Sequence, residues 1–225
     1  MPGLDTENAP NLTKEAKVTM QRLLNAAEEL FAQKGFDGTT IRDITTKAKR
    51  NTAAINYFFG DKQVLYEELF RRRLREMRET RLKSIKAVMS DKNKPDIEKL
   101  LKSYAVAFLE PFTDSARNKI FMQLFARELV EQQLPKTMFI EEMAAPVMSA
   151  LEEALSVVCP TLQKQDCQMC IHSLIGQLIH IVHINAMFEG IQANFRTNFD
   201  LEEAINHIVN FSVAGIRALA KGNQK

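Results

Sequence analysis

TTIRDITTKAKRNTAAINYFFGDK, residues 39–62, is the most informative stretch of this chain. Its pattern predicts two short helices, 41–48 and 52–58, joined by a tight basic turn. Thr40 fits the N-cap of the first helix, and Gly60 fits the break after the second. Two short helices joined in this way are typical of units that lay the second helix in the major groove of DNA.

The second helix has short and polar side chains at its amino-terminal end. A recognition helix needs such residues, because only small side chains let its backbone approach the base edges. Thr52, Ala53 and Ala54 meet this need. Asn56 can form a bidentate hydrogen bond with a base, preferably adenine, and Tyr57 can reach a phosphate or a sugar. The pattern therefore predicts base recognition by Asn56.

Basic residues flank this helix. Lys47, Lys49 and Arg50 lie in or beside the turn, and Lys62 starts the next helix. Thr40 and Lys62 stand at helix amino termini, where backbone N–H groups and the helix dipole also attract phosphate. The structural alternative is a helical hairpin with a solvated basic face.

Charge is unevenly distributed along the chain. A net charge of only +2 excludes a generic polyanion binder. Residues 1–82 carry 15 Lys and Arg against 12 Asp and Glu, whereas residues 83–225 carry 15 against 16. Positive charge is thus concentrated in the part that contains the predicted DNA-contacting helix.

A family resemblance rests on AAEELFAQKGFDGTTIRDITTKA, followed by NTAAINYFFGDKQVLYEELF. Over residues 14–70 these motifs resemble the N-terminal domain of the tetracycline-repressor (TetR) family of bacterial transcriptional regulators. The resemblance implies an all-α fold, with an N-terminal three-helix helix-turn-helix DNA-binding head and a larger C-terminal helical ligand-binding and dimerisation domain. It also implies a homodimer on a palindromic double-stranded DNA operator, released by a small-molecule effector.

The resemblance implies a set of DNA contacts: Thr40, Arg42, Lys49, Arg50, Asn51, Thr52, Ala53, Asn56, Tyr57 and Lys62. Two positions depart from the family pattern. Lys49 and Arg50 replace the usual glycine and apolar residue of the turn, so we expect a non-glycine residue there in a left-handed conformation. Phe58 stands where the family commonly has histidine, so a phosphate-contacting role does not carry over.

The rest of the chain is also predicted to be helical. We expect helices at 13–34, 61–88, 96–110, 115–132, 138–157, 163–189 and 200–221. The expected domains are a disordered arm (1–13), the DNA-binding domain (14–60), a connecting helix (61–88), and the ligand-binding and dimerisation domain (89–225). The connecting helix is the expected lever between effector and DNA.

Aromatic, methionine and polar residues of the carboxyl-terminal region are candidates for the ligand site: Phe108, Phe112, Phe121, Met122, Phe125, Arg127, Met138, Met143 and His183. An ordinary core is the alternative for the apolar members. Arg127 stands in an apolar run, and can pair with an anionic ligand or with Glu128 or Glu131. We expect an apolar or amphipathic effector, possessing an acid group if Arg127 binds it.

The last two long helices, about 163–189 and 200–221, are the dimer interface that the resemblance implies. The first of them has too many apolar residues for one narrow stripe, so it is expected to be covered on more than one side. Gly176, Ala204, Ala214 and Gly215 permit close helix approach. An ordinary monomer core is the alternative.

Cysteines and histidines in 163–189 suggest a zinc site that helical geometry disfavours. Cys167 and Cys170 share a face, but His172 lies about 140–160° away from them around the helix, and His180 and His183 lie further along. We expect no metal and no cofactor. Three cysteines form no disulfide framework, and the polar first residues are no signal peptide, so a cytoplasmic location is expected.

The sequence thus predicts a ligand-responsive transcriptional repressor without catalytic activity. Neither a phosphate-binding glycine loop nor a nucleophile triad nor HExxH supports the enzyme alternative. A transcriptional activator, or a DNA-binding protein without a ligand, remains a further alternative. No membrane partner is expected, since histidines interrupt the most apolar run, 171–188.

Overall fold

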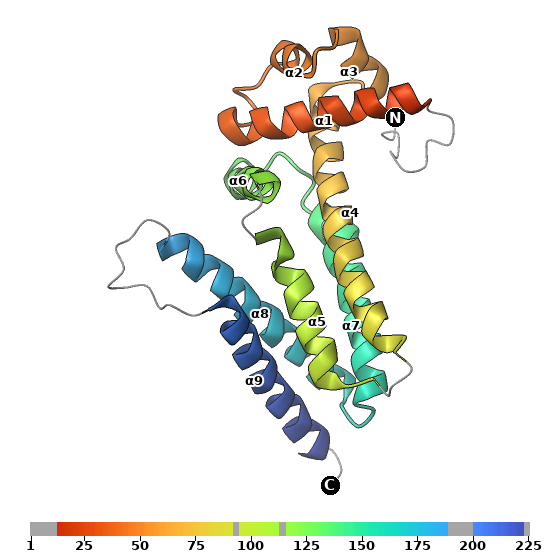
Figure 1. Cartoon of the computed structure of the whole chain (residues 1–225), viewed down its shortest axis with the longest axis vertical. Helices are drawn as coiled ribbons and strands as arrows, with labels where there is room; N and C mark the ends of the chain where they lie inside the picture. Colours follow the sequence, from red (N-terminus) through yellow and green to blue (C-terminus); the bar gives the residue numbers. More distant parts are fainter. Residues whose placement is uncertain (1–12, 92–94, 113–115, 189–199, 223–225) are drawn as a thin grey trace. The chain divides into compact units, whose positions relative to one another are not determined.

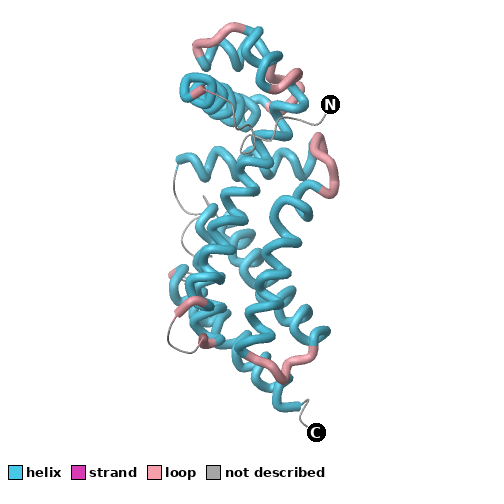
Figure 2. The backbone as a smooth tube through the Cα atoms, turned by 90° about the vertical axis from the view of Figure 1, so that its right-hand side faces the viewer, coloured by secondary structure: helices cyan, strands magenta, loops and turns pink. Residues whose placement is uncertain are grey.

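The structure is a computed structural model that describes residues 13–91, 95–112, 116–188 and 200–222 (Figure 1). Within these ranges the chain forms helices joined by loops and contains no strand (Figure 2). The α-helices are α1 (Lys14–Lys34), α2 (Ile41–Ala48), α3 (Thr52–Phe58), α4 (Lys62–Met89), α5 (Ile97–Leu109), α6 (Ala116–Glu131), α7 (Ala145–Val158), α8 (Lys164–Phe188) and α9 (Leu201–Gly222). The all-α prediction is confirmed.

Helix bounds agree closely with the sequence prediction. α2 and α3 have the predicted limits, and the other described helices differ by one or two residues at their ends. The predicted helix 138–157 also starts at the expected residue, but a π-helical segment, Ile140–Ala144, interrupts it before α7. A 3₁₀ turn, Glu110–Phe112, follows α5. Residues 1–12 of the predicted arm lie outside the described residues.

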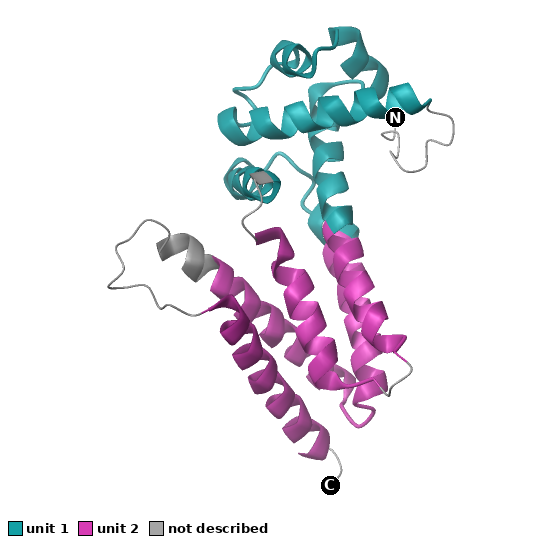
Figure 3. Cartoon of the chain, viewed as in Figure 1, with its two compact units in different colours: residues 1–76, 113–142 teal, residues 77–112, 143–225 magenta. Residues whose placement is uncertain are grey.

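The chain divides into two compact units (Figure 3). Unit 1 comprises residues 1–76 and 113–142, and unit 2 comprises residues 77–112 and 143–225. These units do not follow the expected domain limits, because α6 packs against α1 and so belongs to unit 1. α4 contributes its first part to unit 1 and its second part to unit 2.

Unit 1 has an apolar core whose α1 face was predicted from helical spacing. The buried residues of that face include Leu23, Leu24, Ala27, Leu30 and Phe31. Thr13 caps α1 by accepting a hydrogen bond from the Ala16 N–H at 3.2 Å. Gly35 ends the helix with a φ of 75°, a conformation that favours glycine. These signals position α2 and α3 beside α1.

A buried carboxylate joins α1 to α4 within unit 1. Glu28 is 4% exposed and pairs with Arg72 Nη2 at 2.8 Å and with Arg73 Nε at 2.9 Å. Two cations around one buried carboxylate offset its desolvation. Sequence spacing gave no sign of this pairing, because it joins residues 44 positions apart.

Unit 2 consists of the second part of α4 with α5, α7, α8 and α9. α9 packs against α5 and α8, and α7 packs against α8. The buried face of α9 has helical spacing: Ile205, Ile208, Val209, Val213, Ile216 and Ala220. In the part of the chain that the structure describes, every helix is too short or too polar to cross a membrane.

Candidate nucleic-acid interface

Reciprocal hydrogen bonds fix the start of α2. The Thr40 N–H donates to Asp43 Oδ2 at 3.2 Å, and the Asp43 N–H donates to Thr40 Oγ1 at 3.1 Å. The Thr40 backbone hydrogen bond, then the Thr40 hydroxyl, and Lys34 at 3.6 Å hold the pKa of Asp43 below its usual value. Thr40 itself stays exposed at the amino terminus of α2.

The turn between α2 and α3 confirms the predicted left-handed residue. Lys49 has φ 54° and ψ 50°, in the region where a side chain is disfavoured. The Arg50 N–H donates to Thr45 O at 2.9 Å, which closes the end of α2. Asn51 Oδ1 then accepts from the Ala54 N–H at 3.1 Å and caps α3. The turn is therefore held by backbone bonds and one cap.

α3 has one buried face and one exposed face. Ile55 and Phe58 are buried in the core of unit 1. The exposed residues are Asn51, Thr52, Ala53, Asn56 and Tyr57. Tyr57 is 70% exposed, an unusual state for a large aromatic side chain in a packed head. The exposed face is thus the one with the small and polar residues that base recognition requires.

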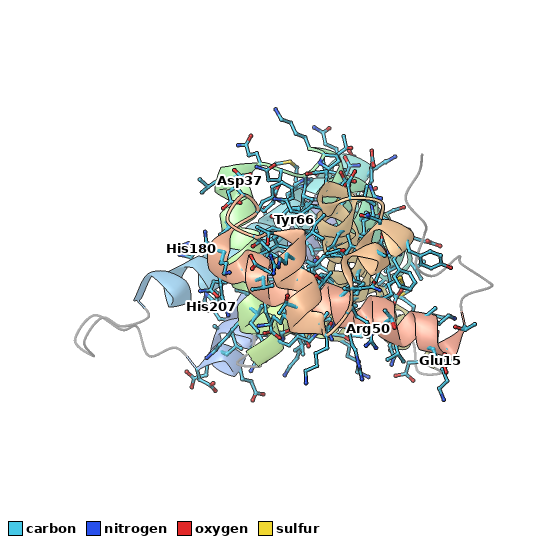
Figure 4. All side chains as sticks on the ribbon, turned by 90° about the horizontal axis from the view of Figure 1, so that it is seen from above. Glu15, Asp37, Arg50, Tyr66, His180 and His207 are labelled. Atoms are coloured by element: carbon cyan, nitrogen blue, oxygen red, sulfur yellow. The ribbon has the colours of Figure 1, made fainter. Side chains whose placement is uncertain are left out.

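Uncompensated positive charge lies beside this face. Arg42 and Lys49 are exposed and form no ion pair with any described residue. Arg50, which is labelled in Figure 4, donates from Nη1 to Lys49 O at 3.0 Å and has no carboxylate partner among the described residues. Lys47, by contrast, pairs with Glu29 at 2.7 Å. Three cations beside the exposed face of α3 therefore have no carboxylate partner among the described residues.

Lys62 has partners inside unit 1. Its Nζ donates to Phe36 O at 3.1 Å and to Thr39 O at 3.2 Å, and lies 4.1 Å from the centroid of the Phe36 ring. These contacts hold the connector that leads from α1 into α2. They leave one of its three N–H donors for another group.

Arg127 on α6 binds the carboxyl-terminal end of α1. Its Nε donates to Ala32 O at 2.8 Å and its Nη2 donates to Gln33 O at 3.0 Å. Nη1 lies 3.6 Å from Glu131 Oε1, the ion pair that the sequence offered as the structural alternative. A guanidinium at a helix carboxyl terminus also interacts favourably with the helix dipole.

Two acidic residues of α6 complete this contact. Glu131 Oε2 accepts from the Phe36 N–H at 3.1 Å, and Glu128 Oε2 accepts from the Tyr66 hydroxyl at 2.9 Å. Burial, then Glu128, raises the pKa of Tyr66 far above its usual value, so the phenol stays a donor. We call Arg127, Glu128 and Glu131 the α6 clasp.

The structure divides the expected ligand residues between the units. In unit 1, Phe121 and Met138 are buried, Met122 and Phe125 are half-buried, and Arg127 belongs to the clasp. In unit 2, Phe108 and Met143 are buried, and Phe112 stacks on Phe108 with ring centroids 6.3 Å apart. The side chain of His183 lies outside the described residues.

A surface hollow of about 380 Å³ in unit 2 involves none of these residues. It is lined by Ser149, Glu152, Glu153, Ser156, Leu162, Lys164 and Cys167. Within α8, Cys167 is buried whereas His172 is exposed, as the helical period predicts. Among the described residues, three potential metal ligands nowhere gather into a group.

Sequence reasoning missed Arg81, a buried arginine of unit 2. It is 2% exposed, with Leu74 and Ile85 buried on the same side of α4. Leu74, Arg81 and Ile85 have the spacing of one stripe along a helix. The burial of Arg81 could have been predicted from this spacing.

Two family profiles match the chain. "Bacterial regulatory proteins, tetR family" matches residues 23–69, which contain α2 and α3. "Tetracyclin repressor-like, C-terminal domain" matches residues 106–215. The second profile includes α6, which the structure places in unit 1.

Two related proteins give the same assignment. The chain is 40% identical over 53 residues to the transcriptional repressor NicS of Pseudomonas putida, covering 24% of this chain and 25% of NicS. It is 26% identical over 111 residues to the transcriptional regulator AcrR of Shigella flexneri, 49% of each chain. The matched segments therefore span a quarter to a half of these relatives.

The solved structure of the regulator FadR from Bacillus subtilis, in complex with stearoyl-CoA, has a similar fold. Its TM-score is 0.64 at 17% identity, and the alignment covers 87% of this chain and 98% of FadR.

Proposed function

This chain belongs to the TetR family of bacterial transcriptional regulators, and from that premise we propose that it is a ligand-responsive repressor. The observation that carries the proposal is the exposed face of α3. Its small and polar residues are exposed, whereas Ile55 and Phe58 are buried and hold the helix in the core. Such a helix can enter a major groove without disturbing the unit that holds it.

The proposed contacts divide by chemistry. Thr52, Ala53 and Asn56 face the bases, with Asn56 as the bidentate reader of adenine. The proposed phosphate and sugar contacts are Thr40, Arg42, Lys49, Arg50, Asn51 and Tyr57. Lys62 primarily holds the connector in place through Phe36 O and Thr39 O, with a phosphate contact left to its remaining N–H.

The proposed homodimer forms through α8 and α9. α9 exposes Phe211 at 65% and Leu219 at 42%, with Ala214 and Gly215 exposed between them. α8 exposes Met169 at 63%. A Cβ on Gly176 or on Gly215 would meet open space, so another helix can approach closely there. Apolar faces with small residues are suited to helix packing between subunits.

The proposed switch acts through α6. This helix belongs to the matched carboxyl-terminal profile, yet its clasp binds the end of α1 and the Phe36 N–H. The clasp couples the position of α6 to that of α1. An effector that favours a different position of α6 would therefore change how stable the present position of α1 is. The proposed effector is an apolar or amphipathic small molecule, the general class to which FadR's stearoyl-CoA belongs.

Capture of genomic fragments by the purified protein tests this proposal. We expect enrichment of a palindrome whose half-sites lie about 34 Å apart, one turn of B-form DNA. Fluorescence anisotropy on that operator should then show release by an effector. Capture without sequence preference would contradict the DNA-reading role, and an operator complex that no metabolite extract weakens would contradict the switch.

A further inference from the structure

Arg81 is a buried cation in the core of unit 2. Its side chain is 2% exposed, and it is among the largest fully buried side chains of the described residues. Arginine is rarely buried completely unless an anion accompanies it. The contacts of its guanidinium group therefore require an explanation.

These contacts do not neutralise the charge. Nη1 donates to Met143 Sδ at 2.7 Å, and Nη2 donates to Phe108 O at 3.3 Å. The group lies 4.3 Å from the centroid of the Phe108 ring. Nε is buried without a hydrogen-bond partner, and no carboxylate in the described part of the chain pairs with Arg81. Of five N–H donors, only two are used, one of them on a weak sulfur acceptor.

Burial without an anion disfavours the charged state, and this burial lowers the pKa of Arg81. Arginine nevertheless stays protonated in proteins. The Phe108 ring offsets part of the cost through a cation–π contact. The remaining cost is relieved when an anion enters, so the site has an intrinsic preference for a negatively charged guest.

We propose that Arg81 binds the carboxylate of the effector, an apolar molecule with a single acid group. This assignment rests on the proposed function and specifies its ligand class. The carboxylate accepts from Nη1, in place of Met143 Sδ, and from an N–H of Nη2, which together form the end-on pair of the guanidinium group. The apolar part of the molecule contacts Phe108 and Met143. Arginine's planar fork matches a carboxylate with two parallel hydrogen bonds.

Met143 is suited to be displaced. Its thioether is a weak acceptor on a flexible side chain, so exchange for a carboxylate gains hydrogen-bond strength. It also lies in the π-helical segment Ile140–Ala144, and such segments frequently occur at functional sites. The acid-binding role thus falls to Arg81, since Arg127 already donates to Ala32 O and Gln33 O.

Calorimetry with octanoate, decanoate and dodecanoate, each compared with its alcohol, tests the assignment without DNA. We expect at least one acid to bind the wild-type protein about tenfold or more tightly than its alcohol. Arg81→Met should remove this preference and leave alcohol binding intact. Arg217→Met is the matched control, because Arg217 is also in unit 2 but is exposed and paired with Glu98 at 2.7 Å.

Equal affinities for acid and alcohol, absence of binding by every acid, or an unchanged preference in Arg81→Met would overturn the assignment. If Arg81→Met does not fold, Met143→Ala decides, because removing the competing acceptor should tighten acid binding severalfold; unchanged binding would count against Arg81. Anisotropy on the operator separates the two proposals. An acid that binds through Arg81 but leaves the DNA complex intact contradicts the switch and not the acid site.

Discussion

Replacing Arg127 with alanine removes the cation of the α6 clasp. The variant loses the bonds from Nε to Ala32 O at 2.8 Å and from Nη2 to Gln33 O at 3.0 Å. It also loses the Glu131 pair at 3.6 Å. The carboxyl-terminal carbonyls of α1 then depend on water or remain unpaired.

The magnitude follows from these contacts. Hydrogen bonds to a charged group contribute about 1.5–3 kcal/mol when well shielded, and a cation at a helix carboxyl terminus contributes about 0.3–1 kcal/mol. The Arg127 side chain is 40% exposed, so solvent screens these interactions. We expect Arg127→Ala to lower the free energy of unfolding of unit 1 by about 2 kcal/mol in total, and Arg127→Lys by about half of that.

Hydrogen–deuterium exchange is the suitable assay, because it reports each unit separately. The Phe36 amide, which donates to Glu131, and the end of α1 should exchange about 30-fold faster in Arg127→Ala, the factor that corresponds to about 2 kcal/mol. Amides of α9 in unit 2 are the internal control and should not change. Less than about twofold acceleration at the end of α1 would refute the clasp.

Three further variants test other parts of the account. Lys62→Ala should destabilise unit 1 by about 1–3 kcal/mol in urea unfolding and lower the salt slope of DNA binding by about 1, because its remaining N–H contacts a phosphate; an unchanged slope would contradict that contact. Phe211→Glu should dissociate the dimer in sedimentation, whereas Leu129→Glu, equally exposed at 65%, should not; a dimeric Phe211→Glu contradicts the interface. Burial raises the pKa of Tyr104 to about 12, so the stability that its neutral phenol contributes below pH 10 is lost as the pH rises from 10 to 12. In Tyr104→Phe, the decrease in unfolding free energy between pH 10 and 12 should be about 2–3 kcal/mol smaller than in wild type. In the exposed control Tyr57→Phe, the decrease should equal that of wild type. Identical pH profiles for wild type and Tyr104→Phe would contradict this account of Tyr104.

Local signals explain why the DNA-binding unit was predictable. Thr40, Gly60 and the apolar spacing of 41–48 and 52–58 act within a few residues of each other, and α2 and α3 have the predicted limits. The left-handed conformation of Lys49 was expected because the chain has lysine and arginine where the family pattern has glycine and an apolar residue. The identity of the exposed face of α3 followed from the same spacing.

Contacts between distant segments were not predictable in this way. Arg127 binds carbonyls about 95 positions earlier, and only the packing of α6 on α1 reveals them. Lys62 stands at a helix amino terminus as expected, but its donors face Phe36 O and Thr39 O. Periodicity could have shown Arg81 to be buried, yet it could not have shown that no acidic residue among those described accompanies it.

Operator binding by Asn56→Ala is the sharpest test of whether α3 reads the operator. Anisotropy titrations should compare wild type and variant on the captured operator and on versions with each base pair of one half-site replaced. We expect the variant to lose about 1–3 kcal/mol of affinity and to become indifferent at one base pair of the half-site, while its non-specific binding stays the same. Equal losses on operator and random DNA, or an unchanged preference at every position, would contradict reading of the operator by α3.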